Sequence, residues 1–484
     1  MLFASNSAKQ HNIEHIMKAN ALSNYLCELN DLVDYELQMF EMTDKRIIEG
    51  FSKLSKNEKL KLLSDAFKNP DQVELLLRSF WHADPDKQKL FDEFSENTIS
   101  NFYFPFGIAP NFLINGKMYM VPMVIEESSV IAAASSSAKF WAEKGGFHSQ
   151  VLSTVKIGQV HFIWNGNIER LHQAFPEIRQ LMIERTLPLT ANMVKRGGGI
   201  LDIELVDLTS QLENYYQLKA SFDTRDSMGA NFINSCLEEF ADIFRDYISE
   251  SDFFQEQDLQ IIMSILSNYT PDCLVHSYVE CEISDYKDFD ETTAADDFVY
   301  KFEKAVQIAQ VDIHRATTHN KGIFNGIDAV ALATGNDFRA IEACGHAYAA
   351  KDGHYKSLSE ISLENGKFRY SLTVPLSMGT VGGLTSLHPL ARLSLELLGN
   401  PGAHELMQIA SCVGLANNFG ALKSLTTKGI QRGHMKMHLL NILNVFDSDE
   451  EEKKKAIHHF KNEKVSYSSV SKFLAELRSQ RQPQ

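Results

Sequence analysis

The sequence predicts an α+β protein in which a small module is inserted into a larger mixed domain. Three observations lead to this prediction. Helical periods dominate the first ninety or so residues. Asn-Gly pairs at 115–116 and 365–366 lie beside apolar or alternating runs, and such pairs favour tight β-hairpins because both residues tolerate positive φ. Between them, residues 155–284 alternate in the order β-α-β-β-α-β, which is the ferredoxin-like, split β-α-β arrangement.

The first elements are helices, and a hairpin follows them. Ser55-x-x-Glu58 precedes apolar residues at 60–63, which is typical of a capping box, where the two side chains satisfy free amide groups of the first turn. Strand periods begin near residue 101. The strand after Asn115-Gly116 ends at Glu126-Glu127-Ser128-Ser129, and a run of small residues at 131–138 comes next.

The inserted module contains one clear amphipathic helix. Its apolar residues repeat at three- and four-residue steps, so one side of the helix is expected to pack on the sheet. This face consists of Ile233, Leu237, Phe240, Phe244 and Ile248. The other elements of the module are expected as strands at 155–164, 201–208, 218–222 and 274–283, and as a helix at 167–184.

After the second hairpin the sequence predicts a long helix and a short charged tail. The helix is expected from His404 to Lys428, with Gly429 as the usual left-handed stop. In the tail, Ser448-x-x-Glu451 is expected to cap a last helix. The order of these elements indicates a small mobile unit at the C-terminal end.

Composition narrows the class of protein. The chain has 484 residues, 44% of them hydrophobic and 23% charged, which excludes a disordered chain. A net charge of −16 offers no positive field for nucleic acid. No apolar run approaches the ~20 residues of a membrane helix, no secretion signal opens the chain, and the 6 cysteines form no CxxC pair. We therefore expect a cytoplasmic protein that binds neither nucleic acid nor membrane, and the histidine spacing indicates no metal site.

Several polar segments are candidates for chemistry, although each has a plainer explanation. No GxGxxG follows a strand, so a standard Rossmann site is not expected. Residues 223–231 lie where a strand meets a helix, and they fit either a phosphate site or, more simply, a helix cap with a packing glycine. Lys321, Glu127 and His434 are each, taken alone, more typical of solvated side chains. The glycines at 379–383 indicate a turn or a close backbone approach.

Taken together, these segments resemble the class II, bacterial-type 3-hydroxy-3-methylglutaryl-CoA (HMG-CoA) reductases, from about Leu54 to near the C-terminus. Several long segments in the right order are far more specific than one motif. The matching segments are ENTIS (96–100), PNFLINGK (110–117), VPMVIEESSVIAAAS (121–135), DTRDSMGAN (223–231), HRATTHNKGIFNGIDAVALATGNDFRAIEA (314–343), GTVGG (379–383) and KGIQRGHMKMH (428–438).

The resemblance implies a set of site residues and a domain plan. The implied catalytic residues are Glu127, Lys321, Asp337 and His434, the implied substrate contacts are Ser129, Arg315 and Asn325, and the implied cofactor contacts are Asp226, Ser227, Met228, Gly229, Ala230 and Asn231. The expected regions are an N-terminal helical extension (1–53), a large HMG-CoA-binding domain (54–153 and 271–432), a dinucleotide-binding domain (154–270) and a C-terminal flap (433–484).

The implied reaction reduces the thioester of HMG-CoA to an alcohol with two hydrides from NAD(P)H, giving mevalonate and CoA for isoprenoid synthesis. Lys321 would face the carbonyl oxygen, and Asp337 and Glu127 would titrate together with it. His434 would protonate the leaving thiolate. The alternatives are the oxidative, catabolic direction with NAD, and a non-catalytic acyl-CoA-binding homologue.

Three features depart from the family pattern or refine it. Ser100 stands where a glycine is usual, which matters if the position needs positive φ. The extension before Leu54 has an amphipathic pattern that suggests docking on the core or on a partner. Thr190 stands where relatives that use NADH carry an acidic residue, with Lys195 and Arg196 nearby, which favours NADPH. The resemblance also implies a homodimer, or a higher homo-oligomer, with active sites shared between subunits.

Overall fold

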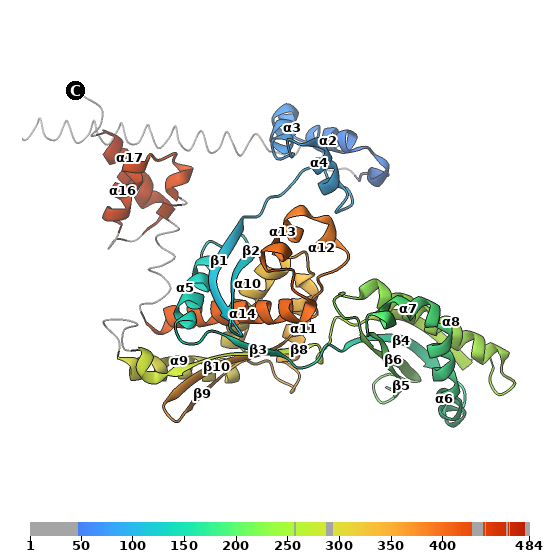
Figure 1. Ribbon diagram of the computed structural model, residues 1–484. Coiled ribbons are helices and arrows are strands. Elements are labelled where there is room, and N and C mark those ends of the chain that lie inside the picture. The colour runs from blue at the N-terminus through green and yellow to red at the C-terminus, as the bar shows by residue number, and fades with distance from the viewer. Residues whose placement is uncertain are drawn as a thin grey trace, which may run out of the picture. The chain divides into compact units, whose positions relative to one another are not determined.

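The computed structural model describes residues 47–255, 258–286, 294–427, 439–440, 442–460, 463 and 465–479 (Figure 1). The chain divides into two compact units, Met1–Phe104 and Pro105–Gln484. Within the described residues no helix is both long enough and apolar enough to cross a membrane.

The described part of the first unit is helical. It contains the short 3-10 helix η1 (Phe51–Lys53) and the helices α2 (Lys56–Ser64), α3 (Pro70–Ser79) and α4 (Pro85–Asp92). The predicted capping box is confirmed. Glu58 N donates to Ser55 Oγ at 3.3 Å, and Ser55 N donates to Glu58 Oε2 at 2.7 Å.

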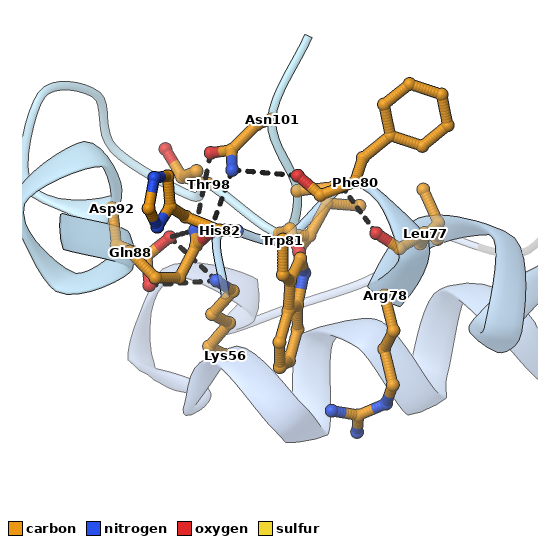
Figure 2. Close-up of polar contacts among 12 residues, drawn as sticks. Lys56, Leu77, Arg78, Phe80, Trp81, His82, Gln88, Asp92, Thr98 and Asn101 are labelled. Carbon is orange, nitrogen blue, oxygen red and sulfur yellow. Dashed lines mark hydrogen bonds and ion pairs between the residues drawn. The ribbon is translucent and has the colours of Figure 1, made fainter. Parts of the chain in front are cut away.

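Polar contacts tie the helices of this unit to the segment that follows them, as Figure 2 shows. Lys56 Nζ forms an ion pair with Asp92 at 2.7 Å, which joins α2 to α4. Asn101 Nδ2 donates to Phe80 O at 2.9 Å and to Gln88 Oε1 at 2.8 Å. The chain between α4 and the second unit is therefore held against the helices at Asn101.

Ser100 lies in the same segment, at the position where the resemblance implied a glycine. It is not among the described residues with positive φ, so its backbone does not require glycine. The Ser100 hydroxyl donates to Leu77 O at 2.6 Å. The substitution therefore adds a contact to α3 rather than strain.

The second unit contains a large mixed part with two sheets. A two-stranded sheet pairs β1 with β2, and a four-stranded sheet has the order β3-β8-β10-β9. The elements of this part are β1 (Phe106–Ile114), β2 (Lys117–Val124), α5 (Val130–Ala142), β3 (His148–Val151), β8 (Leu274–Glu282), η3 (Ile283–Tyr286), α9 (Ala295–Val311), α10 (Ile313–Ala333), α11 (Phe338–Ala349), β9 (Ser359–Glu364), β10 (Lys367–Pro375), α12 (Leu384–Leu387), α13 (Pro389–Leu397) and α14 (Ala403–Thr426).

Both predicted hairpins are confirmed. Asn115 and Gly116 have φ of 49° and 82° between β1 and β2, and Asn365 and Gly366 have φ of 53° and 78° between β9 and β10. These left-handed backbones are the reason for the Asn-Gly pairs. The predicted long helix is α14, and its expected stop at Gly429 lies outside the described residues.

Helices α10 and α14 pack with their backbones close together. A Cβ at Gly326 would lie 2.7 Å from Val413 O, and a Cβ at Gly414 would lie 2.8 Å from Ile327 Cγ1. The two glycines therefore permit a close approach that larger residues would prevent. This contact fixes α10, the helix on which most of the predicted substrate residues lie.

The inserted module is a four-stranded antiparallel sheet of order β5-β6-β4-β7 with helices packed on it. The predicted apolar face of its long helix is confirmed, since all five residues are buried. Its elements are β4 (Lys156–Trp164), α6 (Ile168–Arg185), α7 (Leu187–Lys195), β5 (Gly199–Asp207), β6 (Tyr215–Asp223), α8 (Ala230–Glu250) and β7 (Leu259–Leu266).

The prediction that the strand at 274–283 completes this module is wrong. That strand is β8, which pairs with β3 and β10 in the other sheet. The fourth strand of the module is β7, which pairs with β4 through a register shift. Two adjacent residues in the middle of β7, Ile262 and Met263, are both exposed. The strand therefore lacks the strict alternation of buried and exposed residues that marks a half-buried strand.

The described C-terminal residues form a small helical unit with α16 (Glu450–His459) and α17 (Tyr467–Ser479). Leu443, Phe460 and Val470 belong to its own apolar cluster. The predicted cap is wrong by one residue, because the N-cap is Asp449 and its capping-box partner is Glu452. Asp is as good a cap as Ser, and both frames fit the same pattern.

Candidate active site

The central helix α10 presents a lysine to the segment between β2 and α5. Lys321 Nζ donates to Glu127 Oε2 at 2.8 Å, although the two residues are 194 positions apart. The two side chains are 58% and 36% exposed. Lys321 therefore lies on a rigid helix, not in a loop, and the pair is open to a ligand. Asn325, four residues further along, shares its face of the helix.

The other predicted substrate residues lie on the same two elements. Ser129 is the N-cap of α5, two residues after Glu127, and its side chain makes no cap bond. Arg315 lies in the first turn of α10, which Asp312 caps by accepting from His314 N at 3.0 Å. Burial lowers the pKa of the Arg315 guanidinium from its usual range. The structure thus assigns Ser129, Arg315 and Asn325 to the elements that carry the lysine–glutamate pair.

Asp337 does not join this pair within one chain. Twelve residues of α10 separate Lys321 from the helix end at Ala333, a rise of about 18 Å. Asp337 is the N-cap of α11, where it accepts from Arg339 N at 3.1 Å and pairs with Arg339 Nε at 3.1 Å. Among the described residues no carboxylate other than that of Glu127 forms an ion pair with Lys321. His434 lies outside the described residues.

Asp337 instead lines a cavity of about 420 Å³ together with the predicted cofactor segment. The cavity is built where three stretches of backbone meet. Its lining residues are Ser227, Met228, Gly229, Ala230, Asn231, Phe232, Gly335, Asn336, Asp337, Arg339, Gly379, Val381, Gly382, Gly383, Leu384 and Thr385.

The close backbone approach expected of the glycines at 379–383 is confirmed at Gly379. A Cβ there would lie 2.5 Å from Met228 N. Gly379 N donates to Asn336 Oδ1 at 2.8 Å, and Thr380 N donates to Asp226 O at 2.8 Å. The contacts join the glycine segment to the cofactor segment and hold the cavity open.

The cofactor segment turns from β6 into α8. Gly229 is the N-cap of α8 with φ of 88°, a conformation that favours glycine. The first residues of α8 line the cavity, so the free amide groups and dipole of this helix end are available to a phosphate. Asp226, by contrast, is engaged within the protein, because its Oδ1 accepts from Ala403 N at 2.7 Å at the start of α14.

Thr190 was predicted to lie beside the cofactor ribose. It is buried in α7, and its hydroxyl donates to Leu187 O at 3.4 Å. A cation missed by the sequence interpretation lies at the glycine triplet instead: the Arg225 guanidinium donates to Gly197 O. Arg225 belongs to the quoted DTRDSMGAN segment, so its charge was the signal that could have identified it.

Two carboxyl side chains, Asp328 of α10 and Glu342 of α11, interact with each other. Burial, together with the neighbouring Glu342 carboxylate, raises the pKa of Asp328 to about 8. Asp328 therefore favours its protonated form more than an ordinary carboxyl group does. Among the described residues no group of three or more His, Cys, Asp or Glu side chains could hold a metal ion.

Comparison with known proteins identifies the family. A family model described as hydroxymethylglutaryl-coenzyme A reductase matches residues 56–439. The chain is 37% identical over 402 residues to 3-hydroxy-3-methylglutaryl-coenzyme A reductase of Archaeoglobus fulgidus, covering 82% of this chain and 86% of the relative. It is 32% identical over 402 residues to a probable reductase of the same name from Borreliella burgdorferi, covering 82% and 88%.

Solved structures agree with these relatives. A 3-hydroxy-3-methylglutaryl-coenzyme A reductase from Streptococcus pneumoniae has a TM-score of 0.65 and 34% identity, covering 89% of this chain and 99% of that one. The class II enzyme from the same organism, bound to NADPH in open conformations, has a TM-score of 0.64 and 36% identity, covering 78% and 99%. The fold and the comparisons define an α+β oxidoreductase. The chain belongs to the hydroxymethylglutaryl-coenzyme A reductase family.

Proposed function

We propose that the protein reduces HMG-CoA to mevalonate and free CoA, consuming two NADPH and two protons, for isoprenoid precursor synthesis by the mevalonate pathway. The observation that carries the proposal is the exposed Lys321–Glu127 pair, with Nζ and Oε2 2.8 Å apart. The names of the similar proteins support the substrate. We expect the enzyme to act in the cytoplasm.

The lysine suits the chemistry at the carbonyl carbon. The nicotinamide supplies a hydride, and negative charge then develops on the carbonyl oxygen. An ammonium has three N–H donors, and one of those on Lys321 binds Glu127. The remaining donors can bind the carbonyl oxygen and stabilise this charge. In the second reduction, Glu127 can deliver the proton that the aldehyde oxygen takes up.

Between the two reductions the hemithioacetal must lose a thiolate. This step breaks the carbon–sulfur bond, forms mevaldehyde and releases CoA, whose sulfur takes a proton. We assign that proton to His434, because histidine is the side-chain type whose unperturbed pKa lies closest to neutral pH. We also propose that residues 433–484 form a flap that retains the aldehyde. Deletion of residues 436–484 should then release mevaldehyde; unchanged binding and turnover would rule the flap out.

The site needs a second subunit to bring in Asp337. Within one chain Asp337 lies beyond the end of the helix that carries Lys321, and it lines the same cavity as Leu384. The adjoining helices α12 and α13 expose a row of leucines, namely Leu384, Leu387, Leu390, Leu393 and Leu397. Such a surface favours burial against another protein. We propose a homodimer, alone or within a higher oligomer, in which Asp337 of one chain approaches the lysine–glutamate pair of the other.

Two observations support NADPH over NADH. No carboxylate occupies position 190, and the Arg225 guanidinium lies at the glycine triplet beside Gly197. A cation at that place would attract a 2′-phosphate, whereas a carboxylate would repel it. The structural relative from Streptococcus pneumoniae is bound to NADPH.

Parallel turnover assays with NADPH and NADH test this function. HMG-CoA is supplied, and the loss of reduced nicotinamide absorbance and the release of CoA thiol are followed together. We expect two nicotinamides consumed for each CoA released, with higher efficiency for NADPH. Equal or higher efficiency with NADH would support the oxidative alternative, and binding of HMG-CoA without turnover would support the non-catalytic one.

A further inference from the structure

A buried lysine lies beneath the cofactor segment, and none of the roles described so far uses it. Lys156 is the first residue of β4 and is only 4% exposed. A buried charge is costly unless the protein compensates for it. Its position therefore calls for a specific role.

Both hydrogen bonds that the Lys156 side chain forms with other described residues reach one segment. Its Nζ donates to Thr224 Oγ1 at 2.5 Å and to Ser227 O at 2.8 Å. Thr224 Oγ1 in turn donates to Ser227 O at 2.7 Å. The ammonium thus ties the two sides of the turn between β6 and α8 together from below, and both of its acceptors are uncharged oxygens.

The same turn is held from its other side by the large part of the unit. Asp226 Oδ1 accepts from Ala403 N, and Asp226 O accepts from Thr380 N. Residues 224–227 are therefore fixed between the ammonium of Lys156 and the backbone amide groups of residues 380, 381 and 403. The amide groups that line the cavity begin at Ser227 and continue into α8.

We propose that Lys156 is a positioning residue for the dinucleotide: it holds the turn before α8 in its binding shape and places a buried positive charge behind the pyrophosphate subsite. This inference rests on the proposed function, because it concerns the same cofactor. A preorganised turn lowers the entropy that binding must overcome. A charge shielded from water acts on an anion more strongly than one at the surface.

Burial disfavours the charged form of Lys156, and nearby carboxylates offset part of this effect. It lowers the pKa of Lys156 from its usual range, while the nearby Asp223 and Asp226 carboxylates act in the opposite direction. These carboxylates favour the charged form on which the electrostatic part of the proposal depends.

The test compares Lys156→Met with Lys219→Met in the full-length protein. Lys219 lies on β6 of the same sheet with a half-exposed side chain, so it controls for loss of a lysine from this sheet. Binding of NADPH is measured by calorimetry without substrate, and KM is measured separately for NADPH and HMG-CoA. We expect Lys156→Met to raise the Kd for NADPH about tenfold, equal to about 1.4 kcal/mol, with KM for HMG-CoA unchanged. The control should bind as the wild type does.

A second ligand separates the effect of the Lys156 charge from the effect of the shape of the turn. Reduced nicotinamide mononucleotide lacks the pyrophosphate, so its binding should change much less than that of NADPH. An equal loss for both probes would overturn the charge behind the pyrophosphate. If Lys156→Met does not fold, Thr224→Val removes one acceptor and should weaken NADPH binding in the same direction.

Wild-type affinity in a folded Lys156→Met protein, or in Thr224→Val where the first variant fails to fold, would overturn the inference and leave the proposed function standing. Failure of the wild-type protein to bind any nicotinamide would instead overturn the proposed function.

Discussion

Two lysines of this protein, Lys321 and Lys156, differ in their exposure to solvent and in the groups that they bind. The Lys321 side chain is 58% exposed and pairs with a carboxylate. Lys156 is buried and bonds to a hydroxyl and a carbonyl oxygen. The exposed lysine keeps donors for a ligand, whereas the buried lysine binds the turn that meets a ligand. The comparison teaches that contact with substrate and support of a binding segment need different surroundings.

The exposed pair contributes little to stability, because surface ion pairs are worth about 0–1 kcal/mol. The position of Lys321 beside Glu127 is therefore explained by the chemistry of the lysine, not by a contribution to the free energy of unfolding. Substitution of Lys321 should separate activity from folding.

The largest effect is expected from Lys321→Ala. Loss of the donor to the carbonyl oxygen should lower kcat at least about 10²–10³-fold for both HMG-CoA and free mevaldehyde, with little change in Tm. Lys301→Ala, on the exposed side of α9, is the control and should keep full activity. Turnover of either substrate at the wild-type rate in Lys321→Ala would remove the lysine from the mechanism.

The next largest effect is expected from His434→Gln, and it should divide the reaction. Without a proton for the thiolate, reduction of HMG-CoA should slow about 10²-fold or more, while free mevaldehyde is still reduced. The two rates are measured side by side with the same cofactor. Equal loss of both activities would count against the assigned role.

A smaller effect is expected from Arg225→Ala. Removal of the cation proposed to bind the 2′-phosphate should raise KM for NADPH about tenfold, as loss of one charge-assisted hydrogen bond does, and should change KM for NADH little. Arg245→Ala is the control, because Arg245 is an exposed residue of α8 that pairs with Asp242. A similar change for both cofactors would show that Arg225 shapes the loop without reading the phosphate.

The smallest effect concerns stability at the Asp328–Glu342 pair. Because the folded-state pKa of Asp328 is about 8, above the unfolded value of about 3.9, the folded state holds an extra proton between these values. Stability should therefore fall as pH rises from 4 to 8. We expect the Asp328→Asn protein to lose less stability than the wild type between pH 5 and pH 8.5, measured by urea unfolding at both pH values. Asp272→Asn, at an exposed position, should follow the wild type.

Local sequence signals predicted the elements well. The Asn-Gly turns, the Ser55 cap and the buried face of α8 follow from the preferences of a few neighbouring residues, so no distant contact was needed. The Lys321–Glu127 pair was predicted through the family resemblance, because no spacing rule relates two residues 194 positions apart.

The sequence was less informative where contacts between residues far apart in the chain determine the structure. β7 is an edge strand with a register shift and exposed apolar residues, so its pattern was weaker than that of β8. The assignment of Thr190 came from counting back from the glycine triplet and stays a prediction; in the structure the residue is buried in α7 and its hydroxyl donates to Leu187 O. The contacts of Lys156 and Arg225 depend on the folded turn before α8, although the charge of Arg225 can be read in the matching sequence segment.

If Lys321 of one chain works with Asp337 of another, mixing two inactive variants should restore activity. Lys321→Ala and Asp337→Asn are unfolded together in equal amounts and refolded, so that heterodimers form. A heterodimer would carry one site with both defects and one intact site. We predict that the mixture recovers about a quarter of wild-type turnover of HMG-CoA. A refolded, dimeric mixture that stays as inactive as its parents would contradict the account.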